Sequence, residues 1–352
     1  MPSTMKAIKM TGPGEAKIQD VPLPKLRDDY ILVKVVAVAL NPTDWKHIQY
    51  LPTPGCTVGC DYAGVVEEVG KNVTLPFKKG DRVAGMVHGG NASEKEDGCF
   101  AEYCVAKGDV QITIPDNLSF EEASTLGIGV LTVGQGLYQS LKLPLPNNPS
   151  KEEILVLVYG GSTATGALAI QLAKLSGCTV ITTCSPHNFS HVKSLGASAA
   201  FDYSSPDCAK QIREHTHNKL THAFDCISTA ASAQICADAL STSTHAAYSC
   251  LLNVDFPRKD VAYSYTLVYT ITGEPFNFGP GGKGPEFPAK KEDFEFAKSF
   301  FPLVRGLLEE GRLKVHRPNV RQGGLEGVFE GLEELKANKV SGEKLVNKIA
   351  EP

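Results

Sequence analysis

Hydrophobic and polar residues follow one pattern in the first third of the chain and a different one after about residue 150. Between residues 5 and 125, short runs rich in Val, Ile and aromatic residues are separated by Gly-Asp, Asn-Pro and Pro-Asp turns, as is typical of strands joined by tight connections. The expected strands span residues 31–39, 63–69, 82–87, 100–105 and 110–114. Their even spacing predicts a small barrel or sandwich.

A helix is expected directly after this β-rich segment. Ser119 is followed three residues later by Glu122, the spacing of a capping box, in which each side chain accepts a hydrogen bond from the other residue's backbone N–H. Helical periodicity continues and is interrupted by Gly127 and Gly129. The proline-rich segment 143–153 then predicts a surface connection.

From residue 154 onward, apolar runs alternate with segments of helical periodicity. Strands are expected at residues 154–159, 179–183, 199–202, 222–227 and 245–251, with helices after the first of these strands and at 187–195, 207–216 and 230–240. This alternation predicts a parallel doubly wound sheet. A helix at 294–310, a strand around Val315, a helix at 324–336 and a strand at 343–349 follow. We expect this C-terminal segment to rejoin the β-rich domain.

Composition and charge narrow the class of protein. At 352 residues the chain is long enough for two domains. A net charge of -4 with 21% charged residues gives no electrostatic reason to expect binding to nucleic acid or to an anionic membrane. No apolar run reaches the roughly 20 residues that span a bilayer, and the N-terminal sequence lacks an apolar signal-peptide core. We therefore expect a cytoplasmic protein.

The ten cysteines are scattered along the chain, and several lie in strand-like apolar runs. Disulfides are rare in the cytosol, and unpaired cysteine behaves as a small buried apolar residue. This distribution favours free, buried thiols.

The strand at 154–159 leads into the most informative turn of the sequence. Gly160 and Gly161 follow the strand, and Gly166 lies in the helix that comes next. A glycine turn that opens onto a helix N-terminus binds anions, because free backbone N–H groups and the positive end of the helix point at the ligand. The glycine spacing departs from the strict dinucleotide-binding fingerprint, so the motif alone also fits an ordinary strand–turn–helix unit.

Several separate segments together resemble the medium-chain dehydrogenase/reductase superfamily. They are NPTDWK (41–46), VGCDYAGVVEEVG (58–70), FKKGDRVAG (77–85), the helix that starts SFEEAS, VLVYGGSTATGALAIQLAKLSG (156–177) and SGEKLV (341–346). The similarity is to its zinc-free, quinone oxidoreductase-like branch. Within that branch, YGGSTATG, TCSPHNF (183–189) and FDY (201–203) resemble the stand-alone, trans-acting enoyl reductases that partner fungal polyketide synthases.

The resemblance implies an α/β protein of two domains. Residues 1–126 together with 295–352 are expected to form a GroES-like β-barrel domain that carries out catalysis and binds the substrate. Residues 127–294 are expected to form a Rossmann domain, a doubly wound parallel sheet that binds NADPH.

No metal is expected. Zinc alcohol dehydrogenases of this superfamily hold their catalytic ion with three protein ligands, whereas the first ligand position is Asn41 here and the usual Gly-His-Glu reads Gly59-Cys60-Asp61. A structural zinc lobe needs four closely spaced cysteines, and residues 88–104 contain two. Hydride addition to an activated carbon–carbon double bond is then the natural chemistry. Ordinary core or surface positions are expected for His47, His88 and Cys60.

The end of the second strand of the nucleotide domain indicates which cofactor binds. NAD enzymes place Asp or Glu there to bind the ribose 2′-hydroxyl, but residues 183–188 contain no acid and several side chains able to donate to a phosphate. The alternative is a plain turn in which Ser185 caps a helix. By the resemblance, the contacts to the 2′-phosphate of NADPH are Ser185, Pro186, His187, Asn188 and Tyr203.

The remaining cofactor contacts are implied by the resemblance as well. Thr163 stands where relatives often have glycine, which adds a hydroxyl donor. The expected contacts are Thr43, Asp44, Trp45 and Lys46 at the nicotinamide end, Gly160, Ser162, Thr163, Ala164 and Thr165 at the pyrophosphate, and Leu251, Leu252, Val340 and Ser341 along the cofactor groove.

The implied reaction moves a hydride from C4 of the nicotinamide to the β-carbon of an α,β-unsaturated thioester. A negative charge then develops on the thioester oxygen, and the α-carbon needs a proton. The resemblance places Thr132 beside nicotinamide and substrate. It makes Lys46 the candidate that positions the cofactor or assists charge development, the alternative being a solvated lysine after a turn.

Two glycine-containing segments are candidates for the substrate site. The small residues of the helix at 125–134 leave room for a long acyl chain. The loop formed by residues 273–274 and 279–284 is expected to form the other wall, the alternative being a flexible surface loop. The expected substrate contacts are Gly127, Gly129, Thr132, Gly134, Thr272, Gly273 and Glu274.

The function implied by the resemblance is NADPH-dependent reduction of a polyketide acyl chain held on the carrier protein of a partner polyketide synthase or synthase–synthetase hybrid. Two other classes stay open: a zinc-free quinone or small-enone reductase, and a non-enzymatic NADPH-binding protein. The segment after Leu251 is rich in charged residues and proline, which protects a sheet edge from pairing. We therefore expect a monomer.

Overall fold

The structure, a computed structural model, describes residues 2–352 and separates them into two compact units. The first unit contains the residues up to Ile128 together with Tyr269–Pro352, and the second contains Gly129–Val268. The sequence analysis assigned residues 269–294 to the nucleotide domain. In the structure this segment contacts the first unit, because Glu274 accepts a hydrogen bond from Tyr30.

The first unit is built on a mixed sheet in the order β16-β17-β3-β4-β5-β7, with β6 also paired to β3. Neighbouring strands are antiparallel except β16 and β17. Within residues 2–352 the pairing does not close into a ring, so the GroES-like domain has an open sheet where a barrel was expected. The strands are β3 (Tyr30–Ala39), β4 (Asp61–Val69), β5 (Arg82–Met86), β6 (Tyr103–Lys107), β7 (Gln111–Thr113), β16 (Pro318–Arg321) and β17 (Lys344–Lys348).

Among the described residues, two small hairpins and four α-helices that lie wholly in the first unit complete it. The capping box predicted at Ser119 and Glu122 is confirmed, since each side chain accepts a hydrogen bond from the other residue's backbone N–H, at 3.1 and 2.9 Å. The hairpins are β1 (Thr4–Gly12) with β2 (Glu15–Pro22) and β14 (Phe276–Asn277) with β15 (Glu286–Phe287), and the helices are α1 (Pro42–Tyr50), α2 (Phe120–Ala123), α8 (Lys291–Glu309) and α9 (Gly324–Lys336).

The second unit contains a six-stranded parallel sheet in the order β10-β9-β8-β11-β12-β13. This is the doubly wound Rossmann order, in which the chain starts in the middle and reverses direction beside its first strand. It confirms the predicted nucleotide-binding fold. The strands are β8 (Leu155–Tyr159), β9 (Thr179–Thr183), β10 (Ala199–Phe201), β11 (His222–Asp225), β12 (Ala246–Cys250) and β13 (Val261–Tyr265).

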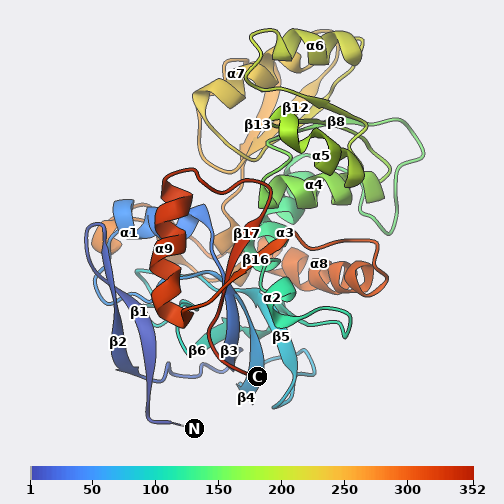
Figure 1. Ribbon diagram of the computed structural model, residues 1–352. Helices are drawn as coiled ribbons and strands as arrows, with labels where there is room; N and C mark the ends of the chain where they lie inside the picture. Colours follow the sequence, from blue (N-terminus) through green and yellow to red (C-terminus); the bar gives the residue numbers. More distant parts are fainter. Residues whose placement is uncertain (1) are drawn as a thin grey trace. The chain divides into compact units, whose positions relative to one another are not determined.

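Helices cover both faces of this sheet, α4 and α5 on one side and α6 and α7 on the other (Figure 1). Such double cover explains why the strands are almost continuous apolar runs. The helix α3 belongs to both units, because the division falls after its second residue. The helices are α3 (Gly127–Gly134), α4 (Ala164–Leu175), α5 (Phe189–Ser194), α6 (Cys208–His215) and α7 (Ala230–Ala239).

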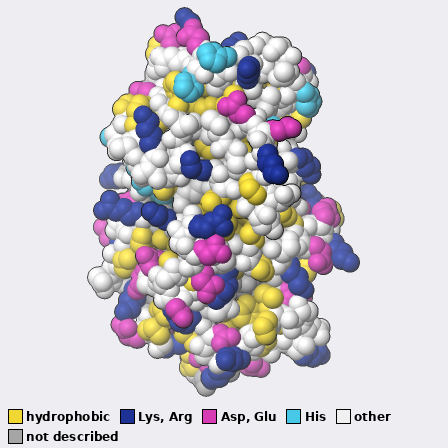
Figure 2. All heavy atoms as spheres, turned by 90° about the vertical axis from the view of Figure 1, so that its right-hand side faces the viewer, with side chains coloured by type: hydrophobic (Ala, Val, Ile, Leu, Met, Phe, Trp, Pro, Cys, Tyr) yellow, Lys and Arg dark blue, Asp and Glu magenta, His cyan; other side chains and the backbone are white. Residues whose placement is uncertain are grey.

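The surface carries charges of both signs. On the face shown in Figure 2, Lys and Arg side chains alternate with Asp and Glu, and hydrophobic side chains occur in small groups. Of the residues described, no helix is long and apolar enough to cross a membrane. All ten cysteines are free, and nine of them are buried, which confirms the expectation of buried thiols.

Candidate functional site

The glycine turn after β8 has a conformation that only glycine adopts easily. Gly160 has a φ of +82°, and its N–H donates to Thr183 Oγ1 at 3.1 Å. A Cβ atom at Gly166 would lie 2.2 Å from the carbonyl oxygen of Gly160, so helix α4 can start directly against the strand end because residue 166 has no side chain. This is the geometry that lets a pyrophosphate approach the backbone at the helix N-terminus.

Thr163 is the N-cap of α4. Its hydroxyl oxygen accepts a hydrogen bond from Gly166 N at 3.0 Å, and the hydroxyl donates to Gly160 O at 2.8 Å. The hydroxyl that we expected to face the phosphates is therefore used inside the turn. In this conformation the turn presents backbone N–H groups of the first helical turn, which have no partner within a helix.

Polar side chains gather where β9 and β10 end. Ser185 Oγ lies 3.2 Å from the hydroxyl of Tyr203, and His187 Nε2 lies 3.2 Å from Asn188 Nδ2. The Tyr203 side chain is 43% exposed. The nearby acid, Asp202, accepts two hydrogen bonds from Ser204, which lower the pKa of its carboxyl. The end of β9 thus offers hydroxyl, imidazole and amide groups, as a site for a phosphate requires.

Two exposed apolar side chains lie at the carboxyl ends of the next strands. Leu252 follows β12, and the N–H of the preceding Leu251 donates to Ser228 Oγ at 2.8 Å. Ile227, which the sequence analysis did not single out, follows β11 and lies against Gly160. Its position beside β8, where the strand order reverses, is the signal that could have identified it.

In the first unit, Thr43 in the first turn of α1 lies beside Tyr269. Their hydroxyl oxygens are 2.7 Å apart, although the residues are far apart in sequence. The Tyr269 ring stacks on His88, with ring centres 4.0 Å apart, and His47 packs edge-on at 5.7 Å. Burial lowers the pKa of both histidines. They and Cys60 are buried core residues, as interpreted from the sequence.

Lys46 and Asp44 lie in the same first turns of α1 but in different surroundings. Lys46 is half-buried, and burial lowers the pKa of its ammonium. Asp44 is fully buried, and its Oδ2 accepts a hydrogen bond from Asn41 N at 2.7 Å. Burial raises the pKa of Asp44 to about 7, with a further contribution from Asp61. Asp44 therefore supports the start of the helix, while Lys46 remains accessible to a ligand.

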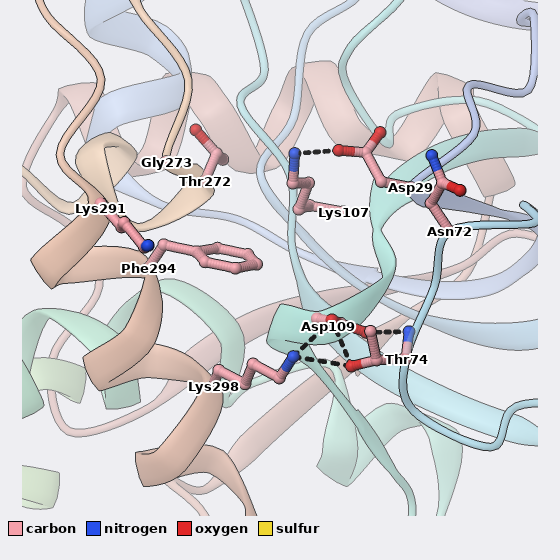
Figure 3. A pocket seen from close by; sticks show the side chains of 10 residues that line it. All are labelled: Asp29, Asn72, Thr74, Lys107, Asp109, Thr272, Gly273, Lys291, Phe294 and Lys298. Carbon is pink, nitrogen blue, oxygen red and sulfur yellow. Dashed lines mark hydrogen bonds and ion pairs between the residues drawn. The ribbon is translucent and has the colours of Figure 1, made fainter.

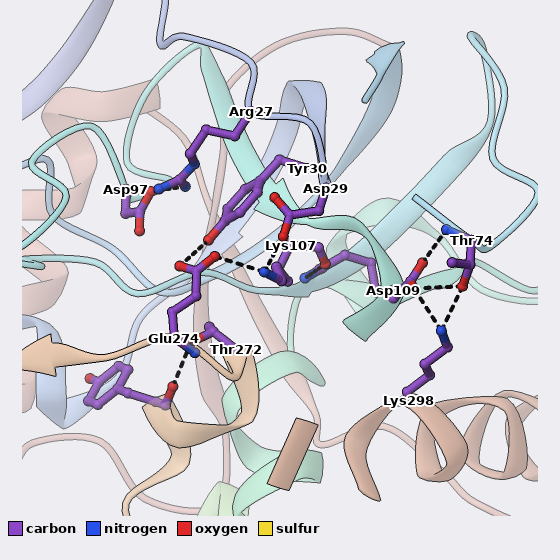
Figure 4. Close-up of polar contacts among 12 residues, drawn as sticks. Arg27, Asp29, Tyr30, Thr74, Asp97, Lys107, Asp109, Thr272, Glu274 and Lys298 are labelled. Atoms are coloured by element: carbon purple, nitrogen blue, oxygen red, sulfur yellow. Dashed lines mark hydrogen bonds and ion pairs between the residues drawn. The ribbon is translucent and has the colours of Figure 1, made fainter. Parts of the chain in front are cut away.

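The loop at 272–274 lies beside a pocket of about 530 Å³ in the first unit (Figure 3). Glu274 is held by two hydrogen bonds, from the Tyr30 hydroxyl at 2.7 Å and from Lys107 Nζ at 2.8 Å (Figure 4). Most of the residues that line the pocket are polar or charged, but apolar atoms supply the larger part of its exposed surface. The lining consists of Asp29, Asn72, Thr74, Lys107, Asp109, Thr272, Gly273, Lys291, Phe294 and Lys298.

The small residues of α3 have different surroundings. A Cβ atom at Gly127 would lie 2.3 Å from Gly85 O and 2.5 Å from Asp61 Oδ1, so packing alone explains that glycine. Thr132 is buried, and a Cβ atom at Gly129 would lie 3.0 Å from Leu168. Substrate contacts by these residues stay a prediction.

Comparisons with known proteins bear on both units. Residues 27–116 match the alcohol dehydrogenase GroES-like domain, and residues 164–252 match the zinc-binding dehydrogenase family. The trans-enoyl reductase resD of Aspergillus sclerotiorum is 47% identical over 363 residues, covering 98% of this chain and 100% of its own length. The trans-enoyl reductase TOXD of Cochliobolus carbonum is 59% identical over 272 residues, which cover 77% of this chain and 91% of TOXD. The chain belongs to the fungal trans-enoyl reductases.

Membership of this family makes the protein an oxidoreductase of the medium-chain dehydrogenase/reductase superfamily that uses a nicotinamide cofactor. The solved CurK enoyl reductase superposes with a TM-score of 0.76 at 18% identity, covering 99% of this chain and 100% of its own. At that identity the likeness shows the shared fold. Within residues 2–352 of this trans-enoyl reductase, no three His, Cys, Asp or Glu side chains are grouped so that they could hold a metal ion.

The expected site residues of this trans-enoyl reductase fall into both units. Thr43, Lys46 and Ser341 belong to the first, whereas Thr132 and the turn at Gly160 belong to the second. Their joint action on one cofactor is a prediction. Sequence reasoning missed Tyr269, and it did not connect the three residues Asn41, Asp61 and Lys344, which form a buried polar cluster.

Proposed function

We propose that this trans-enoyl reductase uses NADPH to reduce the α,β-double bond of a polyketide thioester, and that a carrier protein of a separate polyketide synthase or synthase–synthetase hybrid holds the acyl chain. The observation that carries the proposal is the 47% identity over full length to a trans-enoyl reductase. The reaction class follows from the family. The carrier-bound substrate and the choice of NADPH are the parts that need testing.

The residues of the second unit fit a phosphorylated dinucleotide. The turn at Gly160 allows close approach of a pyrophosphate to the start of α4, since a side chain at Gly166 would collide with the turn. Beyond β9, Ser185 and Tyr203 present two hydroxyl groups, and residues 183–188 contain no carboxylate that would repel a 2′-phosphate. Bound there, NADPH supplies the hydride for the reaction.

In the first unit, Lys46 is proposed to stabilise the negative charge that develops on the thioester oxygen. A half-buried ammonium is less screened than one in water, and its interaction with an oxyanion is correspondingly stronger. Thr43 is proposed to hold the nicotinamide end through its backbone and its hydroxyl, which Tyr269 orients. Thr132 is proposed to contact both nicotinamide and substrate.

A tethered substrate explains why no strongly charged docking face is needed. When the carrier protein binds the enzyme, the attached acyl chain has a high effective concentration at the active site. A weak contact between the two proteins is therefore sufficient for the reaction. The mixed charges on the surface (Figure 2) are consistent with such a contact.

Turnover of NADPH with different acceptors tests the proposal. A simple enoyl thioester and a quinone are offered separately, and NADPH consumption is followed by its absorbance. We expect consumption with the thioester and formation of the saturated product. Consumption with the quinone alone would instead indicate a quinone reductase, and binding of NADPH without consumption by either acceptor would indicate a non-enzymatic role.

A further inference from the structure

Three polar side chains that are far apart in the sequence meet inside the first unit. Lys344 Nζ donates to Asp61 Oδ2 at 2.5 Å and to Asn41 Oδ1 at 2.9 Å. Asn41 Nδ2 donates to the same Asp61 oxygen at 2.9 Å. The side chains of Lys344 and Asp61 are 2% and 0% exposed. Lysine and aspartate are almost never buried to this extent unless they are paired.

Two members of this cluster contact helices that carry predicted site residues. Asn41 is the N-cap of α1, whose first turns contain Thr43 and Lys46. Asp61 begins β4, and its second oxygen accepts a hydrogen bond from Ile128 N at 2.6 Å, in the first turn of α3. Lys344 begins β17. The ammonium group of Lys344 therefore links the starts of two helices, α1 and α3, and of two strands, β4 and β17.

A stability argument does not explain why this cluster is charged. A buried ion pair loses its hydration, and replacing such a pair by apolar residues of similar volume is often neutral or stabilising. Directional hydrogen bonds do differ from apolar contacts in one respect, since they fix the distances between the groups that they join. A charged cluster is thus suited to places where the position of the backbone matters.

We propose that Lys344 is a positioning residue of this reductase: through Asn41 and Asp61 its ammonium holds the start of α1 and the first turn of α3 in place. Thr43 and Lys46 then keep the positions that hydride transfer requires. The kinetic part of the proposal rests on the proposed function, whereas the structural part does not.

The test removes both charges together, because Lys344→Met alone leaves a buried, unpaired carboxylate. In the double variant Asp61→Asn/Lys344→Met, the introduced amide oxygen still accepts the hydrogen bond from Ile128 N. The readouts are hydrogen exchange of the backbone amides of Asn41, residues 43–46 and Ile128, and kcat with an enoyl thioester at saturating NADPH. We expect the exchange to become at least about tenfold faster and kcat to fall about 10- to 100-fold, as misplacement by about an ångström does.

A matched control removes another ion pair of the same unit. Arg321 and Glu334 are joined by two hydrogen bonds, at 2.6 and 2.7 Å, between β16 and α9. Arg321→Met/Glu334→Gln is expected to leave both the exchange of residues 41–46 and kcat unchanged. A comparable effect of this control would overturn the specific role of Lys344.

The proposal is also overturned if Asp61→Asn/Lys344→Met folds with the exchange rates and kcat of the wild type. If that variant does not fold, Lys344→Arg, which keeps the charge but moves its donors, gives the same two readouts: faster exchange with lower kcat supports the proposal, and wild-type values overturn it. A wild-type protein that reduces no thioester refutes the proposed function, while the exchange measurement still decides the positioning role.

Discussion

At the scale of single residues, Lys46 is the side chain on which the proposed chemistry depends most. Because it is half-buried and no ion pair holds it among the residues described, we expect Lys46→Ala to lower kcat at least tenfold while changing the free energy of unfolding by about 1 kcal/mol or less. Lys46→Met keeps most of the apolar stem and serves as the control for packing. Equal kcat in the wild type and both variants would show that Lys46 is a solvated lysine without a role in the reaction, as in the alternative interpretation.

The raised pKa of Asp44 leads us to predict a specific pH dependence of stability. Burial, opposed in part by the hydrogen bond from Asn41 N, raises the pKa of Asp44 from 3.8 to about 7. Between these values the folded protein holds a proton that the unfolded chain has released, so Asp44 lowers stability as the pH rises through this window. Asp44→Asn removes this contribution. Urea unfolding at about pH 5 and about pH 7.5 should show the variant gaining stability relative to the wild type, and parallel pH profiles would contradict the assignment.

We propose that the residues at the end of β9 determine the preference for NADPH over NADH. A Ser185→Ala/His187→Ala variant loses two groups that we propose bind the 2′-phosphate, and hydrogen bonds to charged groups contribute about 1.5–3 kcal/mol each. The ratio of the dissociation constants for NADH and NADPH should therefore fall at least about tenfold. Ser204→Ala, which alters only the hydrogen bonding of Asp202, is the control. Equal affinity of the wild type for both cofactors would refute the preference.

At the scale of elements, helix α4 depends on its N-cap. Thr163→Ala removes the hydrogen bond that Thr163 accepts from Gly166 N and the one that it donates to Gly160 O, so we expect a loss of about 1 kcal/mol in the free energy of unfolding. Thr163→Ser retains the hydroxyl and should lose much less. Because the hydroxyl is engaged within the turn, NADPH affinity should change little in Thr163→Ser. A large stability difference for both variants would show that the methyl group, and not the cap, matters.

Elements with strong local signals could be predicted from the sequence, and those defined by distant partners could not. The bounds of β9 and α9 agree with the prediction, because buried strands and amphipathic helices have clear periodicity. The hairpin of β1 and β2 was missed because β2 is mostly exposed and carries charged residues. The edge strand β13 was missed for a similar reason, since four of its five residues are not buried.

The candidate site likewise has a part with local sequence signals, which could be predicted, and a part made by distant residues, which could not. The turn at Gly160 could be predicted because its glycines, strand and helix are contiguous. The cluster of Asn41, Asp61 and Lys344 could not, because its members are 20 and 283 residues apart and lysine in a sequence indicates an exposed position. Tyr269 likewise reaches Thr43 across 226 positions.

At the scale of the whole molecule, the number of subunits depends on the edge of the nucleotide sheet. The charged segment at 253–260 that we expected at this edge precedes β13, which pairs with β12 and carries the partly exposed Tyr263 and Tyr265. A monomer remains our proposal, because β13 is only five residues long and follows Lys259 and Asp260, and short edges with flanking charges resist pairing. Sedimentation should give a mass near 37.7 kDa. A mass near twice that value would show a dimer.

The most direct test of the reductase assignment follows the hydride itself. Deuterium replaces both hydrogens at C4 of NADPH, an enoyl group is attached to a carrier protein or to a small thiol, and the acyl product is analysed by mass spectrometry. We predict one deuterium at the β-carbon and faster transfer to the carrier-bound chain than to the free thioester. Oxidation of the labelled NADPH without deuterium in the acyl chain, or free enones reduced faster than the same acyl group on its carrier, would contradict the account.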